Sequence, residues 1–261
     1  KAKGLAKRHE LPCVITGETG TGKEEFAKLV HRLRCQNGGQ VPFVAVNCAT
    51  ITQSLAESLL FGHSKGSFTG ADQTTSGYIA NADGGILFLD EIHTLEMPIQ
   101  KKLLRVLADG SYNRLGETKT HISKFQLIAA STKDLDDEVD EGRFLLDLRT
   151  RIMGLELELK PLRERKEDLP ALVSLFAAKK QLKLTTQQFG DLCDFLGKYY
   201  WRGNIRQLFR AIESWIVQAE FQETPLIVAD FPIYKGMLAP QEEHALTCNK
   251  LPARYQADLE I

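Results

Sequence analysis

This chain of 261 residues lacks the features that would commit it to a membrane or to nucleic acid. It has no apolar run of membrane-spanning length and no signal peptide at its start, so we expect no membrane association. Its 33 basic and 34 acidic residues leave a net charge of −1, which removes the electrostatic reason to expect tight nucleic-acid binding. Internal repeats and low-complexity segments are also missing, and the composition is that of an ordinary globular protein.

The five cysteines contain no C-x-x-C pair, which argues against a zinc site and against a disulfide framework. They are Cys13, Cys35, Cys48, Cys193 and Cys248. Several lie in apolar runs, so we expect buried free thiols in a reducing cytosol, that is, a cytoplasmic protein. Because the first residue is Lys1 rather than Met, we also expect the chain to be a piece of a longer protein.

Short apolar runs alternate with helical patterns over the first two thirds of the chain. The predicted strands are PCVIT (12–16), PFVAVN (42–47), ILFLD (86–90), FQLIAA (125–130) and LELEL (155–159). Helical spacing follows the first strand from Lys23 onward and recurs in QKKLLRVLA (100–108). This alternation predicts an α/β fold with a parallel sheet flanked by helices.

Beyond the last predicted strand, only helical patterns continue. The charged, proline-bounded connector PLRERKEDLP (161–170) is a plausible boundary between subdomains. We therefore predict an α/β nucleotide-binding subdomain over 1–162 and a small all-helical lid subdomain over 163–238. The tail 239–261 has no clear period and stays unassigned.

The stretch GETGTGK fits the phosphate-binding pattern G-x-x-x-x-G-K between a predicted strand and a predicted helix. Glycines let backbone N–H groups turn toward phosphate oxygens, and the helix N-terminus adds its positive dipole end. Lys23 would reach the β- and γ-phosphates, and Glu24 stands where many such loops have a magnesium-binding Ser or Thr. The residues predicted to bind the cofactor here are Gly17, Glu18, Thr19, Gly20, Thr21, Gly22, Lys23 and Glu24.

Two adjacent carboxylates end the predicted strand in GGILFLDEI. Neighbouring strand residues point to opposite sides, so Asp90 can hold Mg²⁺ while Glu91 addresses a water molecule. Together with the glycine loop, this pair predicts ATP and Mg²⁺ as ligands, with Asp90 as the metal ligand.

Further candidates are weaker when each is taken alone. Asn47 ends one predicted strand and Ser131-Thr132 follow another, at the same edge of the sheet. Arg206 follows WRGN near the start of a lid helix, from where its side chain could reach the phosphates of the nucleotide. Arg149 and Arg151 lie beyond the nucleotide-binding strands, where an arginine is usually a surface ion-pair former but sometimes completes a neighbour's site.

The stretch GHSKGSFTGA (62–71) places a phenylalanine, Phe68, inside a glycine-rich loop. An exposed ring gains nothing from water, so either Phe68 packs back onto its own chain or the loop presents it to a partner.

These motifs, in this order, resemble the AAA+ domains of sigma-54-dependent bacterial activators, the enhancer-binding proteins. The resemblance runs from about Leu11 to about Pro232 and includes LLRVLADGSYNRLG and WRGNIRQL. Its most specific element is GSFTGA, which is similar to the GAFTGA signature of that family.

The resemblance implies a P-loop AAA+ core with a helical lid, assembled as a homo-oligomeric ring, usually a hexamer, with nucleotide between subunits. It implies ATP hydrolysis that drives the loop against sigma-54 and remodels the closed complex of RNA polymerase. Promoter DNA would bind through a domain absent from this chain. The loop residues implied as the partner contact are Gly66, Ser67, Phe68, Thr69, Gly70 and Ala71.

By the same resemblance, Lys23 binds phosphate, Asp90 organises Mg²⁺ and Glu91 activates water. Asn47 matches the asparagine that restrains this glutamate, and Arg206 matches the sensor II arginine. Glu24 agrees with the GKE that is common in the family.

Several positions depart from the family pattern. Leu145 replaces the first trans-acting arginine, Arg151 matches the second, and Arg149 falls at neither position. In sensor I, Thr132 replaces an asparagine, which shortens the reach of the side chain. Arg202 stands where the family has proline, and Ser67 replaces the alanine of the signature. These departures bear on the rate of hydrolysis and leave the expected nucleotide binding intact.

Two alternatives remain beside a sigma-54-directed ATPase. One is a module that assembles when ATP binds and hydrolyses little, in keeping with Leu145 and Thr132. The other is an AAA+ protein of a different kind, such as a DNA-replication loader, and the GSFTGA loop argues against it.

If Arg151 is the remaining trans-acting arginine, Arg151→Ala lowers ATP turnover by several powers of ten while ATP affinity stays nearly unchanged. Steady-state turnover and binding of a fluorescent ATP analogue check this. Turnover close to that of the unmodified protein would remove Arg151 from the site.

Overall fold

The computed structural model describes residues 1–233 and 237–239, which form two compact units. The first unit contains residues 1–17 and 23–159, and the second contains residues 18–22 together with the described residues from 160 onward. The short segment 18–22 is covalently joined to the first unit at both ends, yet its contacts are with the helical second unit.

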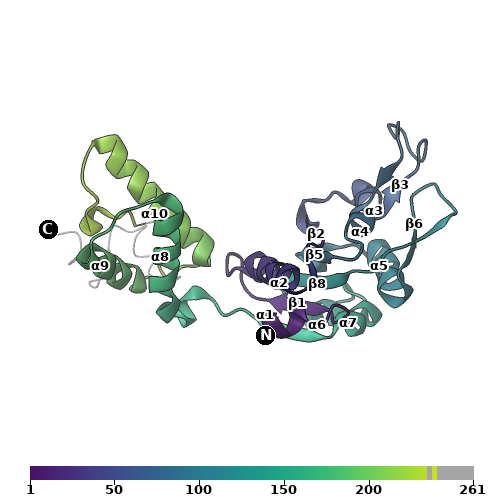
Figure 1. Ribbon diagram of the computed structural model, residues 1–261, viewed down its shortest axis with the longest axis horizontal. Helices are drawn as coiled ribbons and strands as arrows, with labels where there is room; N and C mark the ends of the chain where they lie inside the picture. Colours follow the sequence, from purple (N-terminus) through teal and green to yellow (C-terminus); the bar gives the residue numbers. More distant parts are fainter. Residues whose placement is uncertain (234–236, 240–261) are drawn as a thin grey trace. The chain divides into compact units, whose positions relative to one another are not determined.

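A five-stranded parallel sheet organises the first unit (Figure 1). Its strand order is β2-β5-β8-β1-β9. The strands are β1 (Cys13–Thr16), β2 (Phe43–Asn47), β5 (Ile86–Asp90), β8 (Gln126–Ser131) and β9 (Leu155–Glu158). All pairings are parallel, so the carboxyl ends of all five strands meet at one edge.

Helices cover both faces of this sheet, as the alternation of its buried side chains requires. Ile86 and Phe88 pack into the core with α1 and α2, whereas Leu87 and Leu89 pack into the opposite core. The helices are α1 (Ala2–Ala6), α2 (Lys23–Gly38), α3 (Gln53–Phe61), α4 (Tyr78–Asn81), α5 (Met97–Asp109), α6 (Leu135–Asp140) and α7 (Leu146–Ile152). Two antiparallel ribbons leave this layer, β3 (Gly62–His63) with β4 (Thr75–Ser76), and β6 (Ser111–Asn113) with β7 (Thr120–Ile122).

The second unit is helical over its described residues. Helices α8 (Leu169–Lys180), α9 (Thr186–Gly197) and α10 (Asn204–Gln222) surround a core that contains Trp201 and Trp215. Single 3-10 turns flank them at Leu162–Glu164, Lys166–Asp168 and Val228–Asp230. A capping box at Thr185 and Gln188 begins α9.

The structure confirms the predicted α/β class, the five predicted strands and the helical region that follows them. The predicted domain limits stay a prediction, although the units divide at Leu159 and Lys160, near the expected 162. Apart from Ala239, the predicted tail 239–261 lies outside the described residues. In the described part of the chain, no helix is long and apolar enough to cross a membrane.

The cysteine prediction is correct in part. Cys13 and Cys48 are buried free thiols, and burial raises the pKa of each to about 12. Cys35 and Cys193 are free but only half-buried, and Cys248 lies outside the described residues.

Phe88 is a suitable position for measuring how much the sheet core contributes to stability. Its side chain is 1% exposed, and its ring centroid lies 6.4 Å from that of Phe43. We expect Phe88→Ala to lower the free energy of unfolding of the first unit by about 3–5 kcal/mol through lost contacts and a residual cavity. Ile122→Ala is the control, since Ile122 is 69% exposed and should cost less than about 0.5 kcal/mol. Urea unfolding of both variants measures the difference, and equal midpoints would contradict the expectation.

Candidate functional site

The carboxyl edge of the sheet gathers the polar side chains that the sequence singles out in the first unit. Asn47 and Asp90 are register partners at the ends of β2 and β5. Ser131 ends β8 and pairs in register with Thr16, directly before the glycine loop. Open parallel sheets bind ligands at this edge, so the strand order itself brings these residues together.

Asp90 and Lys23 are opposite charges at this edge. Burial, and next the neighbouring Glu91 carboxylate, raise the pKa of Asp90, while the Lys23 ammonium opposes that rise. Lys23 is only 7% exposed and donates from Nζ to the carbonyl of Gly17 at 2.7 Å. The Asp90 carboxylate could bind a cation, and the Lys23 ammonium could bind phosphate oxygens. Each group would then have a partner of opposite charge.

Glu91 follows in the left-handed backbone conformation, with φ of 52°. This conformation ends β5 and begins the 3-10 turn η2 (Ile92–Thr94). One carboxylate oxygen, Oε2, accepts from the backbone N–H of Thr132 at 3.1 Å and from its hydroxyl at 2.8 Å. The shorter reach expected of Thr132 is therefore long enough to hold Glu91 directly.

Asn47 is placed beside Asp90 but makes a different contact from the one the resemblance implies. Its side-chain oxygen accepts from the N–H of Ala49 at 3.0 Å and caps the 3-10 turn η1 (Cys48–Thr50). Among the described residues, Asn47 has no hydrogen bond to Glu91. Its role in restraining the glutamate stays a prediction.

The remaining residues of the glycine loop, 18–22, pack within the helical unit. Ile205 donates its backbone N–H to the carbonyl of Gly20 at 3.0 Å. A Cβ on Gly20 would lie 2.3 Å from the carbonyl oxygen of Gly203, so only glycine permits this approach. Arg165 donates to the carbonyl of Thr21 at 2.7 Å.

Glu18 is the most strongly held residue of this segment. Both of its carboxylate oxygens accept from the guanidinium of Arg163, at 2.5 and 2.8 Å, and Asn204 donates to it at 3.1 Å. These hydrogen bonds, from Arg163 first, lower the pKa of Glu18. Arg163 also lies 4.6 Å from the ring centroid of Tyr200.

Arg206 lines a cavity of about 470 Å³ in the same unit, together with Thr19, Gly203 and Arg210. Its Cβ lies near Gly20, 3.1 Å from where a Cβ of that glycine would stand. The predicted sensor arginine and the predicted phosphate loop thus adjoin within the second unit.

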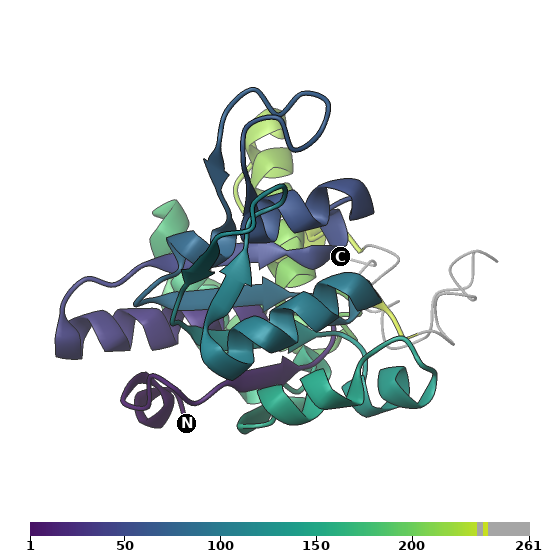
Figure 2. The same ribbon diagram turned by 90° about the vertical axis from the view of Figure 1, so that its right-hand side faces the viewer.

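The GSFTGA stretch forms the end of a hydrogen-bonded loop closed by β3 and β4 (Figure 2). Gly66 donates to the carbonyl of Ala71 at 2.8 Å, and Ala71 donates to that of Phe68 at 3.0 Å. The ring of Phe68 is 38% exposed and meets His63 edge-on at 5.1 Å. The ring therefore both packs on its own chain and remains accessible, and Thr69 beside it is exposed.

The β6–β7 ribbon supports this loop. Ser64 donates to the carbonyl of Leu115 at 3.0 Å, and Leu115 donates to that of Gly62 at 2.9 Å. Gly116, with φ of 74°, comes so close that a Cβ there would lie 2.5 Å from the Cβ of Ser67. The buried hydroxyl of Ser67 has no hydrogen-bond partner among the described residues.

The arginines near α7 are engaged inside their own unit. Arg149 is buried and pairs with Asp136 at 2.9 Å and Glu156 at 2.6 Å, so it supports the fold. Arg151 is exposed and donates to the carbonyls of Leu107 and Ala108 at the end of α5. Leu145 is the N-cap residue of α7 and packs against the core.

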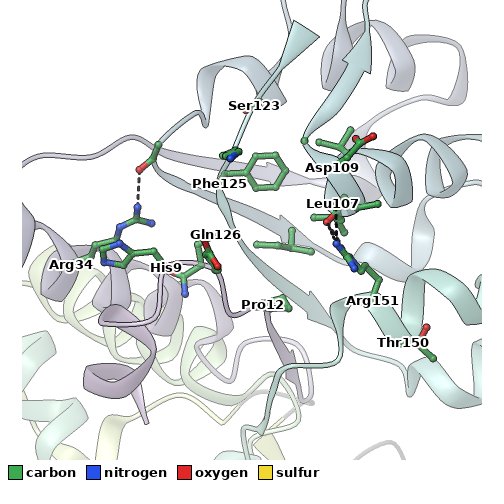
Figure 3. A pocket seen from close by; sticks show the side chains of 17 residues that line it. His9, Pro12, Arg34, Leu107, Asp109, Ser123, Phe125, Gln126, Thr150 and Arg151 are labelled. Carbon is green, nitrogen blue, oxygen red and sulfur yellow. Dashed lines mark hydrogen bonds between the residues drawn. The ribbon is translucent and has the colours of Figure 1, made fainter. Parts of the chain in front are cut away.

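Arg151 also lines a cavity of about 830 Å³ (Figure 3). Pro12, Phe125 and Gln126 lie on its walls, so it opens at the amino end of the sheet, opposite the edge with Asp90. Arg34 also lines the cavity, and its guanidinium donates hydrogen bonds to the carbonyls of Gly84 and Gly85 at 2.8 and 2.9 Å.

The described residues contain no group of three or more His, Cys, Asp or Glu side chains placed to hold a metal ion. Magnesium in nucleotide sites is usually bound through one or two carboxylates and substrate phosphates. Asp90 supplies a carboxylate of that kind.

Sequence reasoning did not identify three contributors to these sites. Arg163 and Asn204 contact the glycine loop from the connector and from the start of α10, which only the tertiary structure reveals. The third is His93, whose Nδ1 lies 3.4 Å from Oε2 of Glu91. Its position two residues after Glu91 is the one feature of the sequence that could have indicated a place in the site.

The parallel sheet, the glycine loop before α2 and the acidic pair at the end of β5 define a nucleotide-binding α/β protein of the AAA+ class. Comparison with known proteins gives the family. The model of the sigma-54 interaction domain matches residues 1–158, and that of the AAA+ ATPase lid domain matches residues 163–247. The chain belongs to the sigma-54 interaction domain family.

Curated relatives agree with this assignment. The chain is 40% identical over 238 residues to the transcriptional regulatory protein ZraR of Salmonella typhimurium, covering 87% of this chain and 54% of the relative. It is 38% identical over 255 residues to the DNA-binding transcriptional regulator NtrC of Proteus hauseri, covering 97% and 52%. The chain thus spans about half the length of these relatives.

Solved structures agree as well. A crystal structure of NtrX from Brucella abortus matches with a TM-score of 0.76 at 28% identity, covering 98% of this chain and 58% of that one. A second NtrX structure, in complex with ATP, matches with a TM-score of 0.73 at 26% identity, covering 99% and 65%.

The close contact of Gly116 with Ser67 predicts which substitution separates the loop from its support. Gly116→Ala should displace the ribbon and speed hydrogen exchange at the amides of Ser64 and Leu115 by about tenfold or more, since about 1.4 kcal/mol changes an opening equilibrium tenfold. Ser67→Ala should leave these amides protected, because it removes only a hydroxyl without a partner.

Gly142→Ala is the matched control for Gly116→Ala, since Gly142 has φ of 71° and a Cβ added there would meet no atom within 4 Å. It carries the same backbone strain without the collision. Slow exchange at Ser64 and Leu115 in Gly116→Ala would show that the contact does not hold the loop.

Proposed function

We propose that this chain is the ATP-hydrolysing part of a sigma-54-dependent transcriptional activator. It binds ATP with Mg²⁺, assembles as a ring of identical subunits, and uses the loop 66–71 to act on sigma-54 in the closed complex of RNA polymerase. The observation that carries the proposal is Glu91, a carboxylate held at one oxygen beside Asp90 at the ligand-binding edge of the sheet.

The phosphate-binding role falls to the glycine loop and Lys23. The backbone N–H groups of residues 17–23 would surround the phosphates, and Lys23 would exchange its bond to Gly17 for phosphate oxygens. The ATP found in the NtrX complex supports this ligand. Arg206, in contact with the same loop, would respond to the γ-phosphate from the helical unit.

Hydrolysis needs a water molecule aligned with the γ-phosphorus and a carboxylate that takes its proton. Glu91 would supply that carboxylate, and Asp90 would hold Mg²⁺, which would neutralise the negative charge that develops on the phosphate. Thr132 restrains Glu91 through two donors on one oxygen. We propose the same restraining function for Asn47 in a nucleotide-bound state, since it is the register partner of Asp90.

A neighbouring subunit would complete the site with Arg151, after its guanidinium leaves the carbonyls of Leu107 and Ala108. Those bonds, together with Leu145 in place of an arginine, favour the second candidate function. In that function the chain assembles and presents its loop on binding ATP, and it hydrolyses ATP slowly or not at all.

The contact with sigma-54 is proposed for Phe68 and Thr69. Gly66 and Gly70 have open space around them, which leaves the end of the loop free to change conformation while β3 and β4 hold its base. The half-exposed ring of Phe68 would gain contacts by leaving His63 for an apolar partner surface.

The test combines turnover with capture of sigma-54. ATP turnover per subunit should rise cooperatively with protein concentration, because the site is shared. With ADP and a metal fluoride as transition-state mimic, the chain should retain purified sigma-54. Phe68→Ala and Thr69→Ala should lose at least about tenfold in retention, on the order of one buried anchor residue.

Phe221→Ala is the matched control, since it removes an 89% exposed ring from α10 in the other unit and should retain sigma-54 normally. ATP binding without turnover would favour the assembly module. Unchanged retention by both loop variants would exclude the loop as the contact.

A further inference from the structure

His93 is a half-buried histidine beside the carboxylate to which we assign water activation. It lies in the turn η2, and its side chain is 9% exposed. Its Nδ1 atom is 3.0 Å from the hydroxyl oxygen of Ser131 and 3.4 Å from Oε2 of Glu91. The imidazole thus joins the end of β8 to the residue that follows β5.

The hydrogen bonds of Ser131 determine which ring nitrogen carries the proton. The Ser131 hydroxyl has one proton, which it donates to the carbonyl of Lys133 at 2.6 Å, and it accepts from the N–H of Lys133 at 3.1 Å. Its oxygen can therefore only accept from Nδ1. A carboxylate is also only an acceptor, so both neighbours of Nδ1 require an N–H there.

Burial of the ring favours a neutral imidazole over a charged one. Burial lowers the pKa of His93, and Lys133 and Lys23 act in the same direction, while Glu91 and Glu138 oppose them. A neutral ring with its proton on Nδ1 satisfies Ser131 and keeps a positive N–H dipole 3.4 Å from Oε2 of Glu91 without adding a full charge.

Two donors bind one oxygen of Glu91, the Oε2 atom, and both come from Thr132, through its backbone N–H at 3.1 Å and its hydroxyl at 2.8 Å. His93 Nδ1 lies 3.4 Å from the same oxygen and acts on it through electrostatic attraction rather than a hydrogen bond. None of the described residues donates to the other oxygen, Oε1. A carboxylate fixed in this way presents a single basic oxygen in a defined direction.

We propose that His93 is a positioning residue for Glu91, which, as its Nδ1–H tautomer, orients the carboxylate so that Oε1 addresses the attacking water. An effect of His93 on turnover rests on the proposed ATP hydrolysis. The geometric argument for the contact rests on the positions of Ser131, Thr132 and Glu91. The φ of 52° at Glu91 adds to the need for such support, because a non-glycine residue held there persists only when its surroundings fix it.

Two substitutions at His93 separate the roles of its nitrogens. His93→Asn retains an N–H close to the position of Nδ1, whereas His93→Gln retains one close to that of Nε2. We expect His93→Gln and His93→Ala to lower kcat by up to about a hundredfold, the cost of misplacing a reacting group by about 1 Å, and His93→Asn to recover most of this loss.

Affinity for a fluorescent ATP analogue and the KM for ATP should stay unchanged in all three variants, since the ring contacts Ser131 and Glu91, which lie outside the phosphate loop. His121→Ala is the matched control, because His121 forms a similar contact with Glu117 at 3.1 Å on the β6–β7 ribbon. It should leave kcat unchanged. Normal turnover in His93→Ala, or equal loss in the Asn and Gln variants, would overturn the proposal.

A second readout does not depend on turnover. A two-dimensional ¹H–¹⁵N spectrum of the imidazoles in the unmodified protein at pH 7 should show His93 as a neutral ring with its proton on Nδ1, and Glu91→Gln should shift that signal. A proton on Nε2 would overturn the inference. If the unmodified protein does not hydrolyse ATP, the proposed function fails, and the tautomer still decides whether His93 holds Glu91.

Discussion

The parallel pairing of β5 between β2 and β8 is the constraint on which the candidate chemistry depends. Because β5 is buried on both faces, its register with its neighbours is determined by two separate cores. That register places Asn47 beside Asp90, and the end of β8 supplies Ser131 and Thr132. A shift of one residue would exchange the faces of Leu87 and Phe88 and remove Glu91 from Thr132.

The glycine loop differs from the other candidate residues in the contacts that hold it. The first unit contains the lysine and the carboxylates, whereas residues 18–22 of the glycine loop are held by the second through Arg163, Arg165 and Asn204. Three side chains of the second unit therefore determine the conformation of this segment of the loop.

The structure changes the importance of several departures from the family pattern. Thr132 in place of an asparagine still reaches Glu91, so this substitution keeps a restraining donor. Arg149 is used in ion pairs with Asp136 and Glu156, which argue against a trans-acting role for it. Arg151 has carbonyl partners in its own unit, which any action on a neighbour must first break. Ser67 has a buried hydroxyl without a partner among the described residues, which an alanine would avoid.

The sequence by itself determined the five strands of the parallel sheet, the helical region and the residues at the carboxyl edge, because apolar periodicity and the glycine pattern are local signals. It identified Lys23, Asp90 and Glu91 through their place directly after or before a predicted element. Only the tertiary structure decided what each side chain contacts. Glu18 meets Arg163 across 145 positions of chain, Glu91 meets Thr132 across 41, and His93 meets Ser131 across 38. Such pairs have no local periodicity, and they form because the packed sheet and the helical core bring distant segments to the same place.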